Sequence, residues 1–285
     1  MKNSFLLSVF ILSFALLKAQ TSSNDNEFIG PEKGSLVVVG GALKSDAIIN
    51  RFIELAGGLD AAFVVIPTAS GEKSYKKDSG FAGVLIDHGA TNVIVLHTKD
   101  KKVANSDAFV KPLRKANAVW FGGGRQWRLV DSYKNTLTEE LIVEVLNRGG
   151  VGGGSSAGAT IQGSYLARGD TKNNQIMMGD HDEGFNLIKN IAIDQHALAR
   201  NRHFDMFEIL KNRPELLGIG IDENTAIVVQ GNQFEVIGES YVAVYDGHFF
   251  SREGMDLKIL PEKSKLFYFL RKGDKYDLLN RKVHH

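Results

Sequence analysis

A glycine-rich stretch at residues 151–159, Val-Gly-Gly-Gly-Ser-Ser-Ala-Gly-Ala, carries the side chain best suited to nucleophilic chemistry. Within it, Gly-Ser-Ser-Ala-Gly at residues 154–158 has the G-x-S-x-G spacing of a nucleophile elbow, in which small neighbours let the backbone turn sharply beneath an exposed hydroxyl. Ser156 is therefore the candidate nucleophile. The N–H of Ala157, at the start of the following helix, is expected to point toward an oxyanion forming on the substrate. The same glycines also fit the looser dinucleotide fingerprint G-x-G-x-x-A, so this motif alone leaves a nucleotide-binding turn open.

Two later motifs supply the groups that a serine nucleophile needs. Residues 194–196 are Asp-Gln-His, and residues 220–223 are Gly-Ile-Asp-Glu. A catalytic serine requires a base, and the base requires a carboxylate to orient it, so His196 and one of the two acids are the candidates. Because adjacent residues on a strand point to opposite faces, only one of Asp222 and Glu223 can reach the histidine. The chain order Ser, His, acid differs from the order Ser, acid, His of α/β-hydrolases, which indicates another architecture.

Glycines also end two earlier strand-like segments, at Gly40-Gly41 and at residues 122–124. In open α/β sheets, ligands bind beyond the carboxyl ends of the strands, where these glycines are expected. Consecutive glycines expose backbone N–H groups, so Gly123 and Gly124 are candidates to complete an oxyanion hole with Ala157. Close packing of the backbone against a neighbouring helix is the alternative explanation for such a run.

Apolar strands alternate with amphipathic helices along most of the chain, which predicts a mostly parallel sheet covered on both faces. Three short C-terminal strands, separated by Gly231-Asn232 and Gly238-Glu239, predict antiparallel strands that extend one edge of that sheet. Besides the strand before Ser156, strands are predicted at residues 35–39, 62–66, 92–96, 118–121, 226–229, 233–237 and 241–245, and helices at residues 45–56, 81–88, 107–115 and 137–146.

The N-terminal residues predict export. Lys2 precedes an apolar run at residues 5–17, and polar residues begin at Thr21, so residues 1–20 are typical of a secretory signal peptide. The run is shorter than the roughly 20 residues of a membrane-spanning helix, although a retained anchor is the alternative. Residues 21–34 are then a flexible segment, and residues 35–285 are short enough to form a single α/β domain. We expect a periplasmic or secreted protein without a stable membrane span after processing.

The composition narrows the function further. The formal net charge is +1, charged residues make up 24% of the chain, and cysteine is absent. A nucleic-acid-binding surface needs a clustered basic excess, which this balance does not supply. The lack of cysteine excludes disulfides and a cysteine nucleophile. Metal-ligand spacing such as H-E-x-x-H does not occur in the sequence, so we expect neither a metal nor a cofactor.

Together these motifs resemble the cyanophycinase and aspartyl-dipeptidase family of serine peptidases. The resemblance runs from about Leu36 to Tyr245 and rests on four motifs in the same order: Phe-Gly-Gly-Gly-Arg-Gln, Gly-Gly-Gly-Ser-Ser-Ala-Gly-Ala, Asp-Gln-His and Gly-Ile-Asp-Glu. It implies a three-layer α/β sandwich similar to the class I glutamine amidotransferases. It also implies that Ser156 is the nucleophile, His196 the general base and Glu223 the carboxylate that orients the histidine.

The activity that the resemblance implies is that of a serine exopeptidase acting on β-aspartyl peptide bonds. Its substrate would be a peptide or a polyaspartate, above all cyanophycin, an arginine-decorated polyaspartate that is cleaved to β-Asp-Arg dipeptides. Since the family often forms dimers, a homodimer is the expected assembly. Two alternatives stay open: an aspartyl dipeptidase of the same family, and a non-catalytic periplasmic module that binds a small ligand. The second alternative leaves the Asp-Gln-His and Gly-Ile-Asp-Glu motifs without a use.

The resemblance also implies which residues bind the substrate. Guanidinium groups suit the carboxylates of an aspartyl peptide, whereas a carboxylate and side-chain amides suit a guanidinium or an amine. The sequence departs from cyanophycinases at Asp205, which replaces a third arginine, and at Ala197, which replaces an aromatic residue. Both changes leave the peptidase chemistry intact and leave the preference for the polymer open. The residues at substrate-binding positions are Gln126, Asp194, Gln195, Arg200 and Arg202.

Overall fold

The computed structural model describes residues 28–254, 257 and 259–284. The predicted signal peptide, residues 1–20, and half of the predicted flexible segment, residues 21–34, lie outside the described residues. Within the described ranges, no helix is both long enough and apolar enough to cross a bilayer. The predictions about the N-terminus therefore stay predictions.

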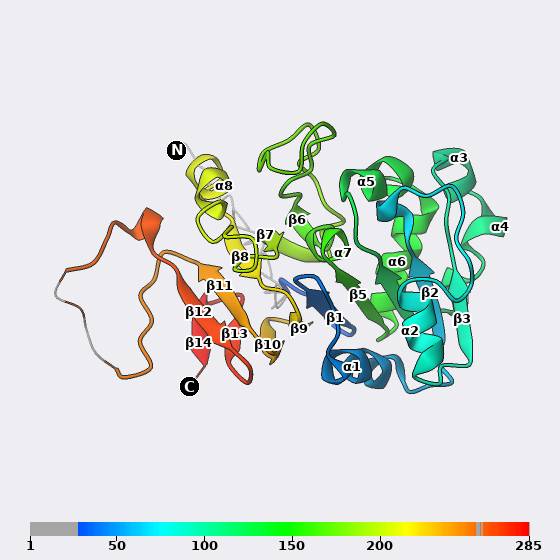
Figure 1. The fold of residues 1–285 in the computed structure, drawn as a ribbon, viewed down its shortest axis with the longest axis horizontal. Helices are drawn as coiled ribbons and strands as arrows, with labels where there is room; N and C mark the ends of the chain where they lie inside the picture. The colour runs from blue at the N-terminus through cyan, green and yellow to red at the C-terminus, as the bar shows by residue number, and fades with distance from the viewer. Residues whose placement is uncertain (1–27, 255–256, 258, 285) are drawn as a thin grey trace, which may run out of the picture.

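The centre of the molecule is a large sheet that is parallel on one side and antiparallel on the other (Figure 1). The described residues place nine strands in it, in the order β14-β13-β10-β9-β1-β5-β4-β2-β3. The neighbours in the run β1-β5-β4-β2-β3 pair in parallel. The remaining strands, β9, β10, β13 and β14, join the sheet by antiparallel pairing. Parallel neighbours require crossover connections, which the helices between β1 and β5 provide. The strands are β1 (Ser35–Val39), β2 (Ala62–Ile66), β3 (Asn92–Val95), β4 (Ala118–Phe121), β5 (Val151–Ser155), β9 (Thr225–Gln230), β10 (Gln233–Gly238), β13 (Lys275–Asp277) and β14 (Lys282–His284).

The strand β1 is buried along its whole length because its alternate side chains enter two separate cores. Leu36 and Val38 belong to one core, and Val37 and Val39 belong to the other. A strand that is buried on both faces has this uninterrupted apolar sequence rather than a polar alternation. The second core is covered by the helices α1 (Asp46–Ala56) and α2 (Phe81–Asp87).

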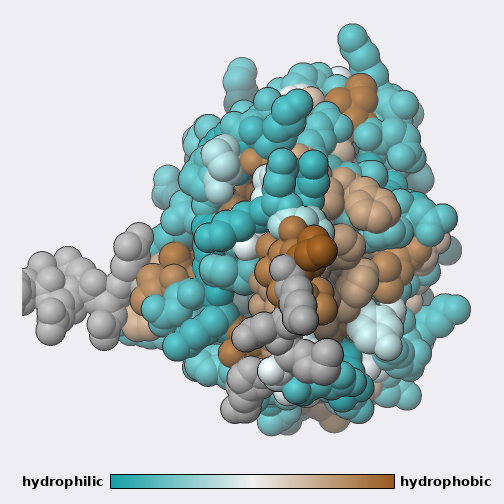
Figure 2. Space-filling view, turned by 90° about the vertical axis from the view of Figure 1, so that its left-hand side faces the viewer, coloured by the Kyte–Doolittle hydropathy of each residue, from teal (hydrophilic) through white to brown (hydrophobic). Residues whose placement is uncertain are grey.

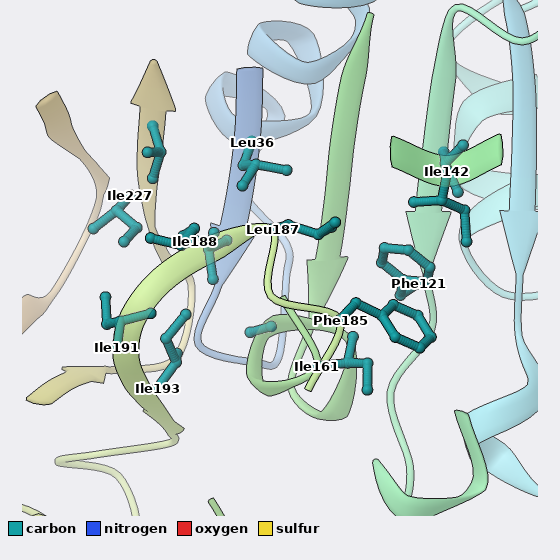
Figure 3. Close-up of a cluster of buried hydrophobic side chains, with 14 of the residues drawn as sticks. Leu36, Phe121, Ile142, Ile161, Phe185, Leu187, Ile188, Ile191, Ile193 and Ile227 are labelled. Atoms are coloured by element: carbon teal, nitrogen blue, oxygen red, sulfur yellow. The ribbon is translucent and has the colours of Figure 1, made fainter. Parts of the chain in front are cut away.

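A second sheet and further helices cover the opposite face of the main sheet. Figure 3 shows Leu36 of β1 and Ile227 of β9 in one buried cluster with Ile188 and Ile191, which come from the second sheet. The described residues give this sheet five strands in the order β12-β11-β8-β7-β6. The predicted mixed α/β sandwich with a mostly parallel sheet is confirmed. The elements of this layer are α5 (Trp127–Tyr133), α6 (Leu137–Asn147), β6 (Gly163–Tyr165), β7 (Ile188–Gln195), β8 (Leu217–Ile221), β11 (Tyr241–Tyr245) and β12 (Tyr268–Arg271).

The strand predicted at residues 241–245 forms, but it does not extend the edge of the main sheet. As β11, it pairs antiparallel with β8, and Val242 lies opposite Ile221. The chain turns at Gly238, whose φ of +105° suits glycine, and leaves the main sheet after β10. The prediction of its sheet is wrong because an apolar alternation identifies a strand without identifying its neighbour.

Several helices are shorter than predicted or were not predicted. The helix predicted at residues 107–115 ends early as α4 (Asp107–Val110), because Pro112 lacks an N–H, and one 3₁₀ turn (Leu113–Lys115) follows. The short helix α3 (Lys101–Ala104) and the helix α8 (Met206–Asn212) lack the long apolar periodicity that would predict them.

The end of the molecule formed by α8, β11 and β12 carries exposed aromatic side chains. Figure 2 looks onto this end, and apolar residues gather near the centre of the view. Ring contacts join Phe204, Phe207, Phe267 and Phe269 into one cluster. The side chain of Phe204 is 61% exposed, so the apolar packing continues to the surface here.

Candidate active site

Ser156 occupies the sharp turn between β5 and α7 (Ala157–Thr160). Its backbone has φ 58° and ψ −114°, a strained conformation for a residue with a side chain and one that suits a nucleophile elbow. The turn is tight enough to exclude side chains on both sides. A Cβ on Gly154 would lie 2.3 Å from the carbonyl oxygen of Gly158, and a Cβ on Gly158 would lie 2.1 Å from that of Phe121.

The end of β1 joins the two sheets and so brings the serine and the histidine together. The N–H of Ser156 donates to the carbonyl of Val39 at 3.0 Å, and the N–H of His196 donates to the carbonyl of Gly40 at 2.9 Å. His196 follows β7, which runs parallel to β8 with Gln195 opposite Ile221. The Asp-Gln-His and Gly-Ile-Asp-Glu motifs therefore leave the second sheet at the same edge.

Ser156, His196 and Glu223 form a chain of hydrogen bonds. The Oγ of Ser156 lies 3.0 Å from Nε2 of His196, and Nδ1 of His196 lies 2.5 Å from Oε1 of Glu223. When Nδ1 is protonated and its N–H donates a hydrogen bond to Glu223, Nε2 is free to accept the proton of the serine. This is the geometry that a base-activated serine requires.

The glycine pair Gly40-Gly41 lies beneath the imidazole. A Cβ on Gly41 would lie 2.2 Å from Cε1 of His196, and a Cβ on Gly40 would lie 2.2 Å from the carbonyl oxygen of Asp222. Only glycine allows the histidine and the acid-bearing turn to approach the end of β1 so closely. These two residues, which the sequence marks as a strand end, therefore support the histidine.

His196 has a pKa below its usual value of 6.5. Burial has the largest effect and lowers the pKa, the hydrogen bond to Glu223 raises it, and the positive charge of Arg200 lowers it again. The imidazole is therefore neutral at neutral pH. A neutral imidazole is the form that can accept a proton from Ser156.

Asp222 faces a different partner from Glu223. Its carboxylate accepts the N–H groups of Leu198 at 3.0 Å and Ala199 at 2.8 Å, and the hydroxyl of Ser240 at 2.6 Å. Burial raises the pKa of Asp222, but these hydrogen bonds outweigh that effect and bring it below 3.8. Asp222 thus holds the turn that follows His196, whereas Glu223 contacts the imidazole.

The two glycines predicted for the oxyanion hole have different surroundings. A Cβ on Gly123 would lie 3.5 Å from Cβ of Ser156 and 4.0 Å from its Oγ, so the backbone of Gly123 runs beside the hydroxyl. Gly124, with φ +140°, packs against the backbone of Ala69, whose oxygen lies 2.1 Å from the position of a Cβ. Gly123 and the buried Ala157 are accordingly the better placed of the three predicted residues.

Most of the residues predicted to bind substrate are buried and bonded to the protein itself. The Nε2 of Gln126 donates to the carbonyl of Ala167 at 2.6 Å. Nη1 of Arg202 donates to Oε1 of Gln195 at 3.1 Å. Arg200 differs from the others because it is exposed. The four buried residues of this predicted set are Gln126, Asp194, Gln195 and Arg202.

Asp194 is paired with Arg168, a residue that the sequence analysis missed. The fully buried guanidinium of Arg168 donates from Nε and Nη2 to both oxygens of Asp194, at 2.8 and 2.9 Å. Its Nη2 also donates to Asp205 at 2.5 Å. Asp205, which replaces an arginine of cyanophycinases, thus has a basic partner from another part of the chain. No sequence motif marks Arg168, and its role follows only from its burial in the structure.

A pocket of about 600 Å³ opens beside the elbow, with Gly123 and Ser155 in its wall. Residues 70–81 supply much of the rest, and no sequence motif marked them. Among the residues that the structure describes, no three His, Cys, Asp or Glu side chains are grouped as metal ligands would be.

An elbow serine that meets a glutamate-bound histidine on a mixed α/β scaffold defines a serine-type peptidase hydrolase. The predicted enzyme class is confirmed by comparison with known proteins. The model of peptidase family S51 matches residues 36–237, and the chain belongs to this family.

Curated relatives carry the name cyanophycinase. One from Geminocystis herdmanii (strain PCC 6308) is 33% identical over 88% of this chain and 95% of its own length. One from Synechococcus elongatus is 27% identical over 99% of this chain and 92% of its own. The predicted resemblance to cyanophycinase-like peptidases is thereby confirmed.

Solved structures agree with this fold. A peptidase from an acI-B1 Actinobacterium has a TM-score of 0.64 and 25% identity over 87% of this chain and 98% of its own. A putative peptidase E protein from Listeria monocytogenes EGD-e has a TM-score of 0.52 and 20% identity over 73% of this chain and 99% of its own. The second match bears on the fold alone.

Proposed function

We propose that this protein is a serine exopeptidase that hydrolyses peptide bonds of aspartyl residues, as in the backbone of a polyaspartate, and uses Ser156 as its nucleophile. Oγ of Ser156 attacks the carbonyl carbon while its proton passes to Nε2 of His196, and Glu223 stabilises the imidazolium that forms. The N–H groups of Ala157 and Gly123, the latter preferred to Gly124, hold the oxyanion. The C–N bond then breaks as His196 protonates the leaving amine, and water, deprotonated by His196, releases the acyl group.

The observation that carries this proposal is the hydrogen-bond chain from Ser156 Oγ through His196 to Glu223, at 3.0 and 2.5 Å. A buried, neutral histidine between a strained serine and a carboxylate has few structural uses. A non-catalytic binding module would have no need of this arrangement.

Cyanophycin is the first substrate to test. The curated relatives that bear the name cyanophycinase cover nearly the whole chain, which supports this choice. Arg200 is exposed and lies close enough to His196 to lower its pKa, so its guanidinium is available for an aspartate carboxylate at the site. Arg202 is buried against Gln195 and supports the site from within.

An aspartyl dipeptidase is the second candidate, and one observation favours it. Asp194 is the carboxylate predicted to receive the guanidinium or amine of the substrate, yet both of its oxygens are bonded to Arg168. With both oxygens of Asp194 occupied, none of the residues predicted to bind substrate offers a free carboxylate to an arginine side chain of cyanophycin. A short aspartyl peptide does not need one.

The test of the proposed function is replacement of the nucleophile. Ser156→Ala should abolish hydrolysis of cyanophycin, of β-Asp-Arg peptides and of α-Asp dipeptides, because only the attacking oxygen is lost. Ser155→Ala is the matched control and should keep most of the activity. Full activity in Ser156→Ala, with loss in Ser155→Ala, would show that the elbow has been assigned one residue out of register.

Export and dimer formation are part of the same proposal. We expect residues 1–20 to be removed on export, so the intact mass of the protein recovered outside the cytoplasm should correspond to a start near Thr21. A mass that retains residues 1–20 would favour the anchor. Light scattering of the purified protein should give twice the monomer mass, and a monomer mass would contradict the expected homodimer.

A further inference from the structure

The pocket beside Ser156 is built from strand ends and one helix. Val65 lies near the end of β2, Trp120 lies in β4, and Val84 lies on α2. Gly123 and Ser155 form the wall nearest to the nucleophile, and Gly123 runs beside the hydroxyl of Ser156. A peptide bond placed on Ser156 Oγ therefore brings a neighbouring group of the substrate to the mouth of this pocket.

The inner wall of the pocket is apolar and rigid. The rings of Phe81 and Trp120 are stacked with their centroids 3.7 Å apart and 14° between their planes. Trp120 is also fixed from behind by Phe52, edge-on at 5.0 Å. Val65 and Trp120 are each only 2% exposed, so this wall is part of the core.

The outer wall is a polar loop, residues 71–80, held in place by Tyr75. The hydroxyl of Tyr75 hydrogen-bonds to Ser70 Oγ at 2.7 Å, and its ring packs edge-on against His97 with centroids 4.7 Å apart. Glu72 and Lys76 are the charged residues among the described lining, and both are exposed. The pocket thus offers an apolar interior with charges of both signs only at its rim.

This distribution of charge decides what the pocket can bind. An ionised side chain inserted against Trp120 and Phe81 would lose water without gaining a buried partner, which is costly. An apolar side chain would bury its own surface and that of the wall, which is favourable in proportion to area. Arginine, the side chain carried by cyanophycin, is the kind of group that this interior disfavours.

We propose that this pocket binds the apolar side chain, of the leucine, methionine or phenylalanine class, of the residue joined to aspartate at the scissile bond. The inference rests on the proposed hydrolysis by Ser156 and, between the two candidate substrates, favours the short aspartyl peptides of a dipeptidase, because an apolar pocket selects an apolar neighbour of aspartate over an arginine-containing one.

The experiment measures kcat/KM of the purified protein on a peptide panel in which aspartate is followed by Leu, Phe, Gly or Arg. Each peptide is made with both the α and the β linkage, so the preferred linkage is determined separately. Because Leu and Phe fill the apolar pocket, the kcat/KM of their peptides should exceed that of the Gly peptides by at least about tenfold. It should also exceed that of the Arg peptides.

Val84→Asp tests the pocket directly because it places a carboxylate on its wall. This change should lower kcat/KM for Leu and Phe by about tenfold and raise it for Arg, since a guanidinium then gains a partner. Ile86→Asp is the matched control on the same helix. Ile86 is 41% exposed and lies outside the pocket lining, so this change should leave the order of the panel unchanged.

The outcomes separate this inference from the proposed function. If the wild-type protein hydrolyses neither cyanophycin nor any peptide of the panel, the proposed function fails. If the kcat/KM for the Arg peptides equals or exceeds that for the Leu and Phe peptides, or if folded Val84→Asp keeps the wild-type order, the pocket assignment is overturned.

Should Val84→Asp not fold, Leu43→Ala replaces it, because Leu43 lines the pocket from the β1–α1 connection. It should reduce kcat/KM for Leu and Phe and leave Gly unchanged, and an unchanged ratio would likewise refute the inference.

Discussion

Asp222 and Glu223 are neighbours in the chain with separate tasks, and replacing each by its amide distinguishes them. Glu223→Gln removes the charge that orients and stabilises His196, so kcat should fall by about 10⁴. Asp222→Asn should instead lower the melting temperature, with a smaller loss of kcat, because Asp222 holds the turn at residues 198–199. Both quantities are measured on the same preparations. Equal, modest losses of kcat would mean that another group orients the histidine.

Burial is the main cause of the lowered pKa of His196, and the charge of Arg200 contributes to it. The positive charge of Arg200 lowers the pKa of His196, so Arg200→Gln should raise that pKa. Because the neutral imidazole is active, the acid limb of the kcat/KM profile should move to higher pH. The other charged groups that act on the imidazole, Glu223 and Arg202, are unchanged in this variant.

Arg200→Lys is the control for this effect because it keeps the charge, and its acid limb should stay near that of the wild type. An acid limb that does not move in Arg200→Gln would contradict the electrostatic role. A loss of kcat/KM at every pH, common to both variants, would report substrate binding instead, because a lysine cannot reproduce a two-pronged contact.

The side chains of the candidate site were predictable where a local motif fixes them. Ser156, His196 and Glu223 lie in short motifs whose residue types match one chemistry. The burial of Asp194 was not predictable, because its partner Arg168 is distant in sequence and belongs to no motif. A residue type shows what a side chain can bind, but only packing determines whether it is open to a ligand.

At the scale of the elements, the end of β7 is held by a buried ion pair that can be tested by removing one partner. Arg168→Met leaves the carboxylate of Asp194 buried without its counter-charge, so the free energy of unfolding should fall by about 3–5 kcal/mol. The side chain of Asp205 is 37% exposed, so Asp205→Asn should change the free energy of unfolding by less than about 1 kcal/mol. Urea unfolding of the three proteins gives these values.

The double change Arg168→Met with Asp194→Leu separates lost pairing from lost packing. It removes the unpaired charge, so it should recover much of the stability lost in Arg168→Met. If Arg168→Met alone unfolds within about 1 kcal/mol of the wild type, the ion pair does not hold this strand.

The elements themselves were partly predictable. Apolar runs located the strands of the main sheet, because a strand buried on both faces leaves a continuous apolar signature, as in β1. The partner of β11 and the pocket beside Ser156 were not predictable. Both depend on segments that meet only after folding: β11 reaches β8 through the turn at Gly238, and the pocket joins residues of β2, α2, β4 and β5 with the connections between elements.

At the scale of the whole molecule, three histidines set the response of stability to mild acid. The pKa values of His97 and His196 are lowered, mainly by burial, so the unfolded chain binds these protons first and stability falls below about pH 6.5. The pKa of His181 is raised: burial lowers it, but hydrogen bonds to Asp131 and Asp180 outweigh that effect, so its protonation adds stability in the same range. The gain from His181 therefore offsets part of the loss from His97 and His196 as the pH falls from 7 to 5, and the melting temperature across this range measures the balance.

Stronger acid should unfold the protein through its buried carboxylates. Burial raises the pKa values of Asp222, Asp274 and Asp277, but hydrogen bonds outweigh it and bring them below 3.8. Groups with lowered pKa values stabilise the fold above the unfolded pKa and lose this effect as the pH falls through the folded pKa, so the melting temperature should drop steeply below about pH 4. Calorimetric scans from pH 7 to 2.5 measure the melting temperature of the wild type and, for comparison, of Asp277→Asn. That variant should melt lower at pH 7, because Asp277 holds Asn280, and should show a smaller drop in acid. A wild-type melting temperature that stays level down to pH 3 would contradict the role of these carboxylates.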